Sequence, residues 1–343
     1  MTETAPGDGP AGPSADTPFE APGAVLAVDS GGSGLRAVVA VAGVARTAPV
    51  TSAEPVRTGP SGIDPGHLLD QLLPMADGLL RAAGATGLRA VAIGATGMAT
   101  LGDALRAELP AALAKELGVR RLALAADAVT AYAGALGHRP GAVVAAGTGM
   151  IAVGTDLTAW HRADGWGHLL GDCGGGSWIG RAGLEAAMRA FDGRRGGSPA
   201  LLARAEEMFG PAGDLPGKLY PRTDRPAVLA SFAPQVAACA PLDEVAAGIL
   251  RAAATHIAEA AAAVSPASGP CEVALTGGLF KMGEPLLAPV RAELARLLPH
   301  AREIPAEGDP LHGAVRIASD LAAGGTTLPH DGRMLYIRTE KDS

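Results

Sequence analysis

The feature that most constrains the fold is a short pattern found three times: an apolar strand that runs directly into a glycine turn. The expected strands cover residues 25–29, 142–146 and 272–275, and the glycines are Gly31, Gly32, Gly34, Gly147, Gly149, Gly277 and Gly278. Glycine adopts positive φ and lets backbone amides approach a ligand closely, and amides turned in this way form an anion-binding concavity. One such turn alone is read as an ordinary hairpin. Three of them at strand ends indicate a nucleotide, with the hydroxyls of Ser33 and Thr148 as further donors.

Two other nucleotide-binding patterns are excluded. The sequence contains no G-x-x-x-x-G-K-[ST], so a P-loop is ruled out. Gly32-x-Gly34-x-x-Ala37 fits the relaxed dinucleotide fingerprint, but that fingerprint requires its glycines to open a helix. Here they open the strand-like run Ala37-Val-Val-Ala-Val. The dinucleotide interpretation therefore fails on its structural context.

The pattern along the chain predicts a duplicated α/β architecture. Two strand–glycine turn–strand units, near residues 29–34 and 147–149, open two similar halves, and each is followed by helical periodicity. Because the glycine turns join hairpins, the sheets should be mixed rather than purely parallel. The expected helices are 64–83, 103–117, 128–136, 179–191, 198–209, 242–263 and 284–297.

Composition shifts predict the domain limits. Residues 1–23 are rich in Pro, Gly and acidic residues and are expected to be a disordered extension. We expect an N-terminal domain at 24–137, a C-terminal domain at 138–324 and a loose tail at 325–343.

Bulk properties exclude several function classes. The net charge is −7 and aromatic residues make up 3%, which argues against a nucleic-acid partner. The three cysteines are far apart, so neither a disulfide framework nor a zinc site is expected. No apolar run reaches the roughly 20 residues of a spanning helix, and no secretory signal pattern is visible. We expect a cytoplasmic protein with no membrane partner.

Five motifs, in order along the chain, resemble those of one protein family. Asp29-Ser-Gly-Gly-Ser-Gly and Val144-Ala-Ala-Gly-Thr-Gly resemble the two phosphate motifs of the sugar-kinase, actin and heat-shock ATPase superfamily, and Ala274-Leu-Thr-Gly-Gly-Leu resembles its adenosine motif. Asp309-Pro-Leu-His-Gly-Ala resembles the start of its last helix. The loop from Gly165 to Arg181 is the most specific match. It resembles the loop of N-acetylglucosamine kinases and of benzoyl-CoA-reductase-activator ATPases, and the nearest likeness is to actinobacterial glucosamine kinases.

This resemblance implies two ribonuclease-H-like, actin-like ATPase domains, with ATP, Mg²⁺ and a sugar in the cleft between them. It implies that Asp127 is the catalytic aspartate, which accepts the proton of the sugar hydroxyl. By position alone, Asp127 could equally be a helix N-cap. The resemblance makes Asp29 the carboxylate nearest Mg²⁺, acting through water because Mg²⁺ keeps its hydration shell. The bland alternative for Asp29 is a turn-forming residue.

The resemblance assigns further sugar contacts to Asp172, Thr148 and His168, although Asp172 could also be a turn residue and His168 is better explained as a structural or rim residue. Cys173 departs from the family, which carries Glu after this Asp. The loss of that carboxylate removes one sugar or metal contact, which favours glucosamine over the acetylated sugar. The cysteines that ligate the iron–sulfur cluster of the family's reductase activators lie elsewhere, so Cys173 is expected to be a small polar filler.

Three functions are compared: an amino-sugar kinase, an ATPase activator of a redox partner, and a nucleotide-binding regulator. An activator should carry cysteines that ligate a cluster, and a regulator should carry an added domain, so the kinase is favoured. Glucosamine is a cation at neutral pH and suits a site rich in carboxylates such as Asp127 and Asp172. The prediction is phosphorylation of the glucosamine C6 hydroxyl, with N-acetylglucosamine as the alternative and a homodimer permitted.

Overall fold

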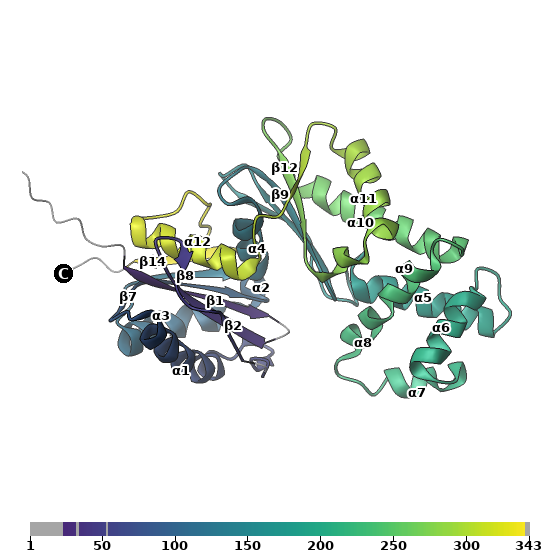
Figure 1. Cartoon of the computed structure of the whole chain (residues 1–343), viewed down its shortest axis with the longest axis horizontal. Helices are drawn as coiled ribbons and strands as arrows, with labels where there is room; N and C mark the ends of the chain where they lie inside the picture. Colours follow the sequence, from purple (N-terminus) through teal and green to yellow (C-terminus); the bar gives the residue numbers. More distant parts are fainter. Residues whose placement is uncertain (1–22, 32–33, 53, 340–343) are drawn as a thin grey trace, which may run out of the picture.

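The computed structural model describes residues 23–31, 34–52 and 54–339 (Figure 1). Nearly all of the expected N-terminal extension lies outside these residues, as do the predicted nucleotide ligands Gly32 and Ser33. The described chain forms two halves, each built on a mixed sheet flanked by helices. This architecture confirms the expected α/β fold with mixed sheets.

The sheet of the N-terminal half has seven strands among the described residues. Its order is β14-β8-β7-β1-β2-β3, and β4 also pairs with β2. The central strand β1 is antiparallel to β2 and parallel to β7, which is the mixed pairing that the glycine hairpin requires. The bounds are β1 Ala24–Gly31, β2 Gly34–Val41, β3 Val44–Ala45, β4 Val50–Ser52, β7 Leu88–Ala95, β8 Arg121–Ala126 and β14 Leu335–Thr339. A separate two-stranded ribbon pairs β5 Thr58–Gly59 with β6 Gly62–Ile63.

The sheet of the C-terminal half repeats this plan. Its order is β11-β10-β9-β12-β13, with an antiparallel hairpin of β9 and β10 and a parallel pairing of β9 with β12. The strand order β3-β2-β1-β7-β8 in the first sheet therefore corresponds, strand for strand, to the order β11-β10-β9-β12-β13 in the second. The bounds are β9 Gly141–Ala146, β10 Met150–Thr155, β11 Trp160–Asp164, β12 Glu272–Thr276 and β13 Arg302–Pro305. The expected duplication is confirmed.

Helices cover both sheets, and several begin at caps that are visible in the sequence. The Asp64 side chain accepts a hydrogen bond from the His67 amide at the start of α1, and Gly84 ends that helix with φ +63°. The helices are α1 Pro65–Ala83, α2 Met98–Leu101, α3 Asp103–Leu117, α4 Asp127–Leu136, α5 Gly176–Phe191, α6 Pro199–Phe209, α7 Leu215–Leu219, α8 Arg225–Ser231, α9 Ala233–Cys239, α10 Glu244–Val264, α11 Glu284–Leu297 and α12 Pro310–Ala323, with 3₁₀ turns η1 Ala212–Asp214 and η2 Gly278–Met282. The sequence indicated the long helices, but not the short helices α2, α7, α8 and α9.

Helix α4 lies between the two sheets and joins them. It contacts β1, β7 and β8 on one side and β9, β10 and β12 on the other (Figure 1). Helix α12 packs directly on α4 and on the N-terminal sheet. A Cβ atom on Gly134 would lie 2.2 Å from the Asp309 carbonyl oxygen, and one on Gly313 would lie 1.9 Å from that of Thr130. Only glycine lets the two helix backbones approach this closely.

The C-terminal segment differs from the sequence-based expectation. Residues 310–324 were expected in the C-terminal domain and residues 325–343 as a loose tail, but α12 packs on the N-terminal sheet. Strand β14 then pairs antiparallel with β8, with Leu335 opposite Ala125 and fully buried. The pairing partner lies about 200 residues earlier in the chain, so a short edge strand of this kind has no local signal. Residues 340–343 of the expected tail lie outside the described residues.

The close crossing of α4 and α12 predicts that one added methyl group at Gly313 lowers the stability of the protein. Gly313→Ala places a Cβ atom against the Thr130 carbonyl, so the two helices must separate. We expect the free energy of unfolding to fall by about 1–3 kcal/mol, measured by urea denaturation. Gly78→Ala in α1 is the matched control, because nothing lies within 4 Å of its Cβ position. It should gain about 0.5–1 kcal/mol from helix propensity. An equal urea midpoint for Gly313→Ala and the unchanged protein would show that the crossing tolerates separation.

Candidate active site

A cavity of about 670 Å³ opens between the two halves. The N-terminal half contributes the ends of β1, β7 and β8 and the start of α4, and the C-terminal half contributes the β9–β10 hairpin turn and the loop that follows β11. The hairpin turn closes on itself, since the Gly147 amide donates to the Gly149 carbonyl at 2.9 Å. The Gly176 and Ser177 amides at the start of α5 donate to the carbonyls of Gly147 and Thr148. The cavity therefore meets a rigid glycine turn backed by a helix N-terminus.

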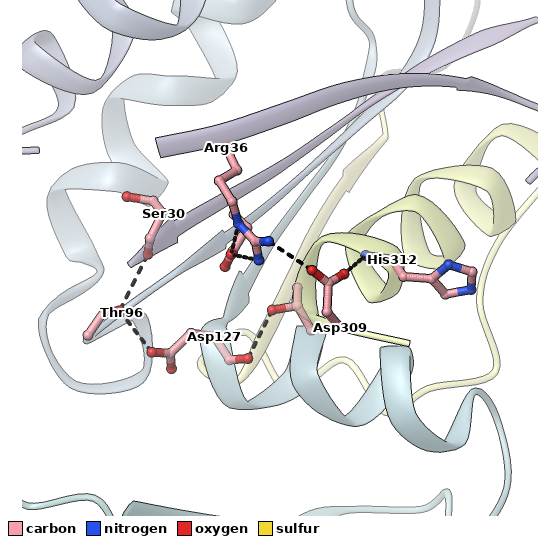
Figure 2. A network of polar contacts seen from close by, with 8 residues as sticks. Ser30, Arg36, Thr96, Asp127, Asp309 and His312 are labelled. Atoms are coloured by element: carbon pink, nitrogen blue, oxygen red, sulfur yellow. Dashed lines mark hydrogen bonds and ion pairs between the residues drawn. The ribbon is translucent and has the colours of Figure 1, made fainter. Parts of the chain in front are cut away.

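Asp127 stands at the N-terminal wall of this cavity, where β8 gives way to α4 (Figure 2). Its Oδ1 accepts a hydrogen bond from the Ala128 amide at 2.8 Å, and its Oδ2 accepts one from the Thr96 hydroxyl at 2.8 Å. Thr96 is itself fixed, because its amide donates to the Ser30 carbonyl at 3.1 Å. The carboxylate is thereby held in one orientation by neighbouring strands of the N-terminal sheet.

Arg36 joins two carboxylates at the next edge of the site (Figure 2). Its Nη2 lies 2.6 Å from Asp29 Oδ2, and its Nη1 lies 2.8 Å from Asp309 Oδ2. Asp309 also caps α12 by accepting the His312 amide at 2.9 Å. Burial raises the pKa of Asp29 above its ordinary value, an effect that Arg36 opposes. Arg36 thus ties the first glycine hairpin to the start of the last helix.

The loop after β11 brings Asp172 against the second glycine turn. Asp172 Oδ1 accepts the Gly167 amide at 3.0 Å, and a Cβ atom on Gly149 would lie 2.3 Å from Asp172 Oδ2. Glycine at 149 is therefore required for this approach. Burial raises the pKa of Asp172, and the nearby charge of Asp164 raises it further.

Arg162 supplies a cation on the same side of the cavity. Its Nε donates to the Asp164 carbonyl at 3.1 Å and its Nη2 to the Gly165 carbonyl at 2.6 Å. The guanidinium carbon lies 4.2 Å from the centroid of the Trp166 ring, a cation–π arrangement. Arg162 is therefore held in place by backbone carbonyls and an aromatic ring.

The structure brings most of the residues predicted from the sequence to this cavity. Those that line it are Asp29, Gly31, Asp127, Gly147, Thr148, Gly149, Asp172 and Gly277. Gly278, His168 and Cys173 are not among its lining residues. The His168 Nε2 atom is buried and has no hydrogen-bond partner among the described residues.

Sequence reasoning missed Thr96, Arg36, Arg162 and Asp164 as members of the site. Thr96 had a usable signal, since it follows an apolar strand and precedes Gly97, as in the three glycine turns that were recognised. Arg36 and Arg162 lie within strands, where a single arginine resembles any solvent-facing residue.

The described residues contain neither a metal-binding cluster nor a membrane-spanning helix. No group of three or more His, Cys, Asp or Glu side chains in the described ranges is placed to hold a metal ion. None of the helices seen there is long and apolar enough to cross a membrane.

The family model for the BadF/BadG/BcrA/BcrD ATPases matches residues 26–315. This match spans most of the chain and both halves of the cavity, so the chain belongs to this ATPase family. The resemblance seen in the sequence motifs is confirmed.

Particular relatives share its sequence or fold. The chain is 42% identical over 69 residues to the N-acetylmuramic acid/N-acetylglucosamine kinase of Clostridium acetobutylicum, a match that spans 20% of this chain and 22% of that relative. A candidate N-acetylglucosamine kinase from Chromobacterium violaceum superposes with a TM-score of 0.66 at 25% identity, over 85% of this chain and 97% of that one. A second candidate of this kind, from Porphyromonas gingivalis, gives a TM-score of 0.61 at 17% identity over 85% and 97% of the two chains, and shares the fold.

The raised pKa of Asp172 predicts an acid limit on ATP-dependent activity. If Asp172 accepts a sugar hydroxyl, as the sequence predicts, its protonation removes that acceptor, so kcat/KM for the sugar should fall as the pH drops through a value above the ordinary Asp range near about 4. Asp172→Asn removes that titration and should lower the plateau of kcat/KM by about 10- to 100-fold. The pH dependence of kcat/KM for both proteins checks this. An identical acid limb in both would assign the titration to another group.

Proposed function

We propose that this ATPase transfers the γ-phosphoryl group of ATP to the C6 hydroxyl of an amino sugar. The observation that carries the proposal is that Asp127, Asp172 and the Gly147–Gly149 turn line one cavity between the two halves. A kinase needs a base, sugar-binding groups and a phosphate cradle within one site, since phosphoryl transfer depends chiefly on positioning and electrostatic stabilisation.

In this proposal Asp127 accepts the proton of the attacking hydroxyl. The Thr96 hydroxyl and the Ala128 amide each occupy one of its carboxylate oxygens, which fixes its direction while leaving lone pairs on both. A carboxylate held in this way can bind the sugar hydroxyl as an acceptor before it takes the proton. Asp172 and Thr148 then hold the sugar from the opposite wall of the cavity.

The glycine turns are proposed to hold the ATP phosphates. The Gly147 amide is engaged within the turn, so the amides of Thr148 and Gly149, with those of the first hairpin, bind phosphate oxygens, and Gly277 marks the adenosine end. Asp29 Oδ2 is engaged by Arg36, which disfavours direct metal coordination by that oxygen. Asp29 fits the predicted Mg²⁺ role through water, since Mg²⁺ retains several waters and takes its other ligands from the phosphates. Mg²⁺ would neutralise charge on the transferred phosphoryl group.

Glucosamine is the proposed amino sugar, because Asp127 and Asp172 offer two carboxylates to its ammonium group. The sequence-based argument from Cys173 gains no support, since Cys173 is not a cavity-lining residue. A second candidate, N-acetylglucosamine, is favoured by Arg162, whose positive charge on the same cavity opposes an ammonium group. The names of the relatives point the same way. Cytoplasmic location and a homodimer stay predictions.

A panel of sugars separates these candidates. ADP release would be measured with glucosamine, N-acetylglucosamine, N-acetylmuramic acid and glucose as acceptors. We expect kcat/KM to be highest for glucosamine, by about 10- to 100-fold over N-acetylglucosamine, as one charge-assisted hydrogen bond allows. A higher value for N-acetylglucosamine would replace glucosamine with the second candidate. ADP release that no sugar stimulates would contradict the kinase proposal itself.

The assignment of the base predicts a separation of turnover from ATP binding. Asp127→Asn keeps the size of the side chain and can still contact Thr96, but it cannot accept a proton. We expect kcat to fall by about 100- to 10,000-fold, with the Kd of ATP unchanged in a calorimetric titration. Asp77→Asn, at an exposed position on α1, is the matched control and should leave both constants unchanged. A near-normal kcat for Asp127→Asn would remove the residue from this role.

A further inference from the structure

Asp164, the last residue of β11, occupies a costly backbone conformation beside the proposed sugar site. Its φ is +59°, and that of Asp172 in the same loop is +55°. Only Ala42 and Leu157 share this left-handed conformation among the other non-glycine residues that the structure describes. Non-glycine residues rarely adopt this conformation unless the surrounding structure requires it, and such positions gather at functional sites.

In this conformation the Asp164 side chain accepts two backbone hydrogen bonds. Its Oδ1 accepts the Asp172 amide at 2.5 Å, and its Oδ2 accepts the Cys173 amide at 2.9 Å. Both carboxylate oxygens therefore bind the backbone of the segment that carries Asp172. A Cβ atom on Gly171 would lie 2.3 Å from Asp164 Oδ1, so the loop closes tightly around this carboxylate.

A second hydrogen bond in the same loop, between Gly167 and Asp172, lies at the cavity. The Asp172 carboxylate accepts the Gly167 amide, while the Asp172 amide donates to Asp164. Asp164 thus holds the backbone of Asp172, and Gly167 holds its side chain. Asp164 is not among the residues that line the cavity, so it acts on a ligand through Asp172.

We propose that Asp164 is a positioning residue that fixes Asp172 against the Gly147–Gly149 turn and thereby sets the affinity for the sugar. This inference rests on the proposed kinase function for its kinetic consequence. Its structural part, the hold of Asp164 on the loop, is independent of the substrate.

The left-handed backbone at residue 164 favours glycine, whereas the two hydrogen bonds to the side chain require a carboxylate. Substitutions can therefore separate the role of the backbone from that of the side chain. Asp164→Gly relieves the left-handed backbone but removes both acceptors. Asp164→Asn keeps the size, tolerates the backbone, and offers one carbonyl oxygen in place of two carboxylate oxygens. If Asp164 positions Asp172, the protection of the loop amides from exchange and the affinity for the sugar should both fall in the order Asp, Asn, Gly at residue 164. If residue 164 matters only through its backbone conformation, both quantities should be at least as high with Gly as with Asp.

Hydrogen exchange of the full-length protein, followed by mass spectrometry without sugar, tests the structural part. We expect peptides that cover residues 165–175 to exchange about 10- to 100-fold faster in Asp164→Gly, with Asp164→Asn between this variant and the unchanged protein. Asp156→Gly is the matched control, because Asp156 also accepts two backbone amides, from Thr158 and Ala159, in an exposed turn. It should speed exchange only in its own turn. Unchanged exchange at 165–175 in Asp164→Gly would overturn the proposal.

Steady-state kinetics test the functional part. We expect KM for the sugar to rise by about 10- to 100-fold in Asp164→Gly, with KM for ATP unchanged and with Asp156→Gly matching the unchanged protein. A sugar KM that stays constant, or a parallel loss for both substrates, would contradict a positioning role. If the unchanged protein phosphorylates no sugar, the kinase proposal fails, and the exchange result still decides whether Asp164 holds the loop.

The pH profile adds a readout that a purely structural role would not move. The charged or titratable groups that act on Asp172 are Asp164, His168 and Arg162, and the negative charge of Asp164 raises the pKa of Asp172. Asp164→Asn removes that charge, so the acid limb of kcat/KM should move to lower pH. An acid limb that stays in place, or moves to higher pH, would count against the assignment.

Discussion

The close crossing of α4 and α12 is the contact on which the two-part architecture depends. Helix α4 lies between both sheets, and α12 returns the chain from the C-terminal half to the N-terminal sheet. Gly134 and Gly313 let the two helix backbones meet without intervening side chains. Because Asp127 begins α4 and Asp309 caps α12, the same crossing places one carboxylate in the cavity and a second at its edge.

Charged side chains around the cleft are held in place by specific contacts. Arg36 holds Asp29 and Asp309 together and so links the first glycine hairpin to α12. On the opposite wall, Arg162 donates to the Asp164 carbonyl, and the Asp164 carboxylate accepts the Asp172 amide. A phosphoryl-transfer site needs fixed charges, since reorganisation during the reaction would raise the barrier. The backbone hydrogen bonds to Asp127, Asp164 and Asp309 supply that fixity.

Local signals were enough for much of the fold. The glycine turns after apolar strands indicated both hairpins and the mixed sheets, and the helical periodicity of residues 64–83 indicated α1. Strand β14 was missed because its pairing partner, β8, lies far away in sequence. Arg36 and Arg162 were missed for a different reason: an arginine within a strand resembles any solvent-facing residue until the strand register and the path of the following loop show its partners.

The sequence by itself determined the family and the positions of the glycine turns, because glycine conformations and strand ends are encoded by a few adjacent residues. It also singled out Asp29, Asp127 and Asp172 as carboxylates at strand or loop ends. Tertiary structure alone decided that these residues meet in one cavity and that Arg36 also engages Asp309. Those relations depend on distances between segments far apart in the chain, which are fixed only when α4 and α12 pack the two halves together. The contacts of Arg36 with Asp29 and of Asp164 with Asp172 are closer in sequence, but they require the β1–β2 register and the path of the loop after β11, which the residue pattern did not reveal.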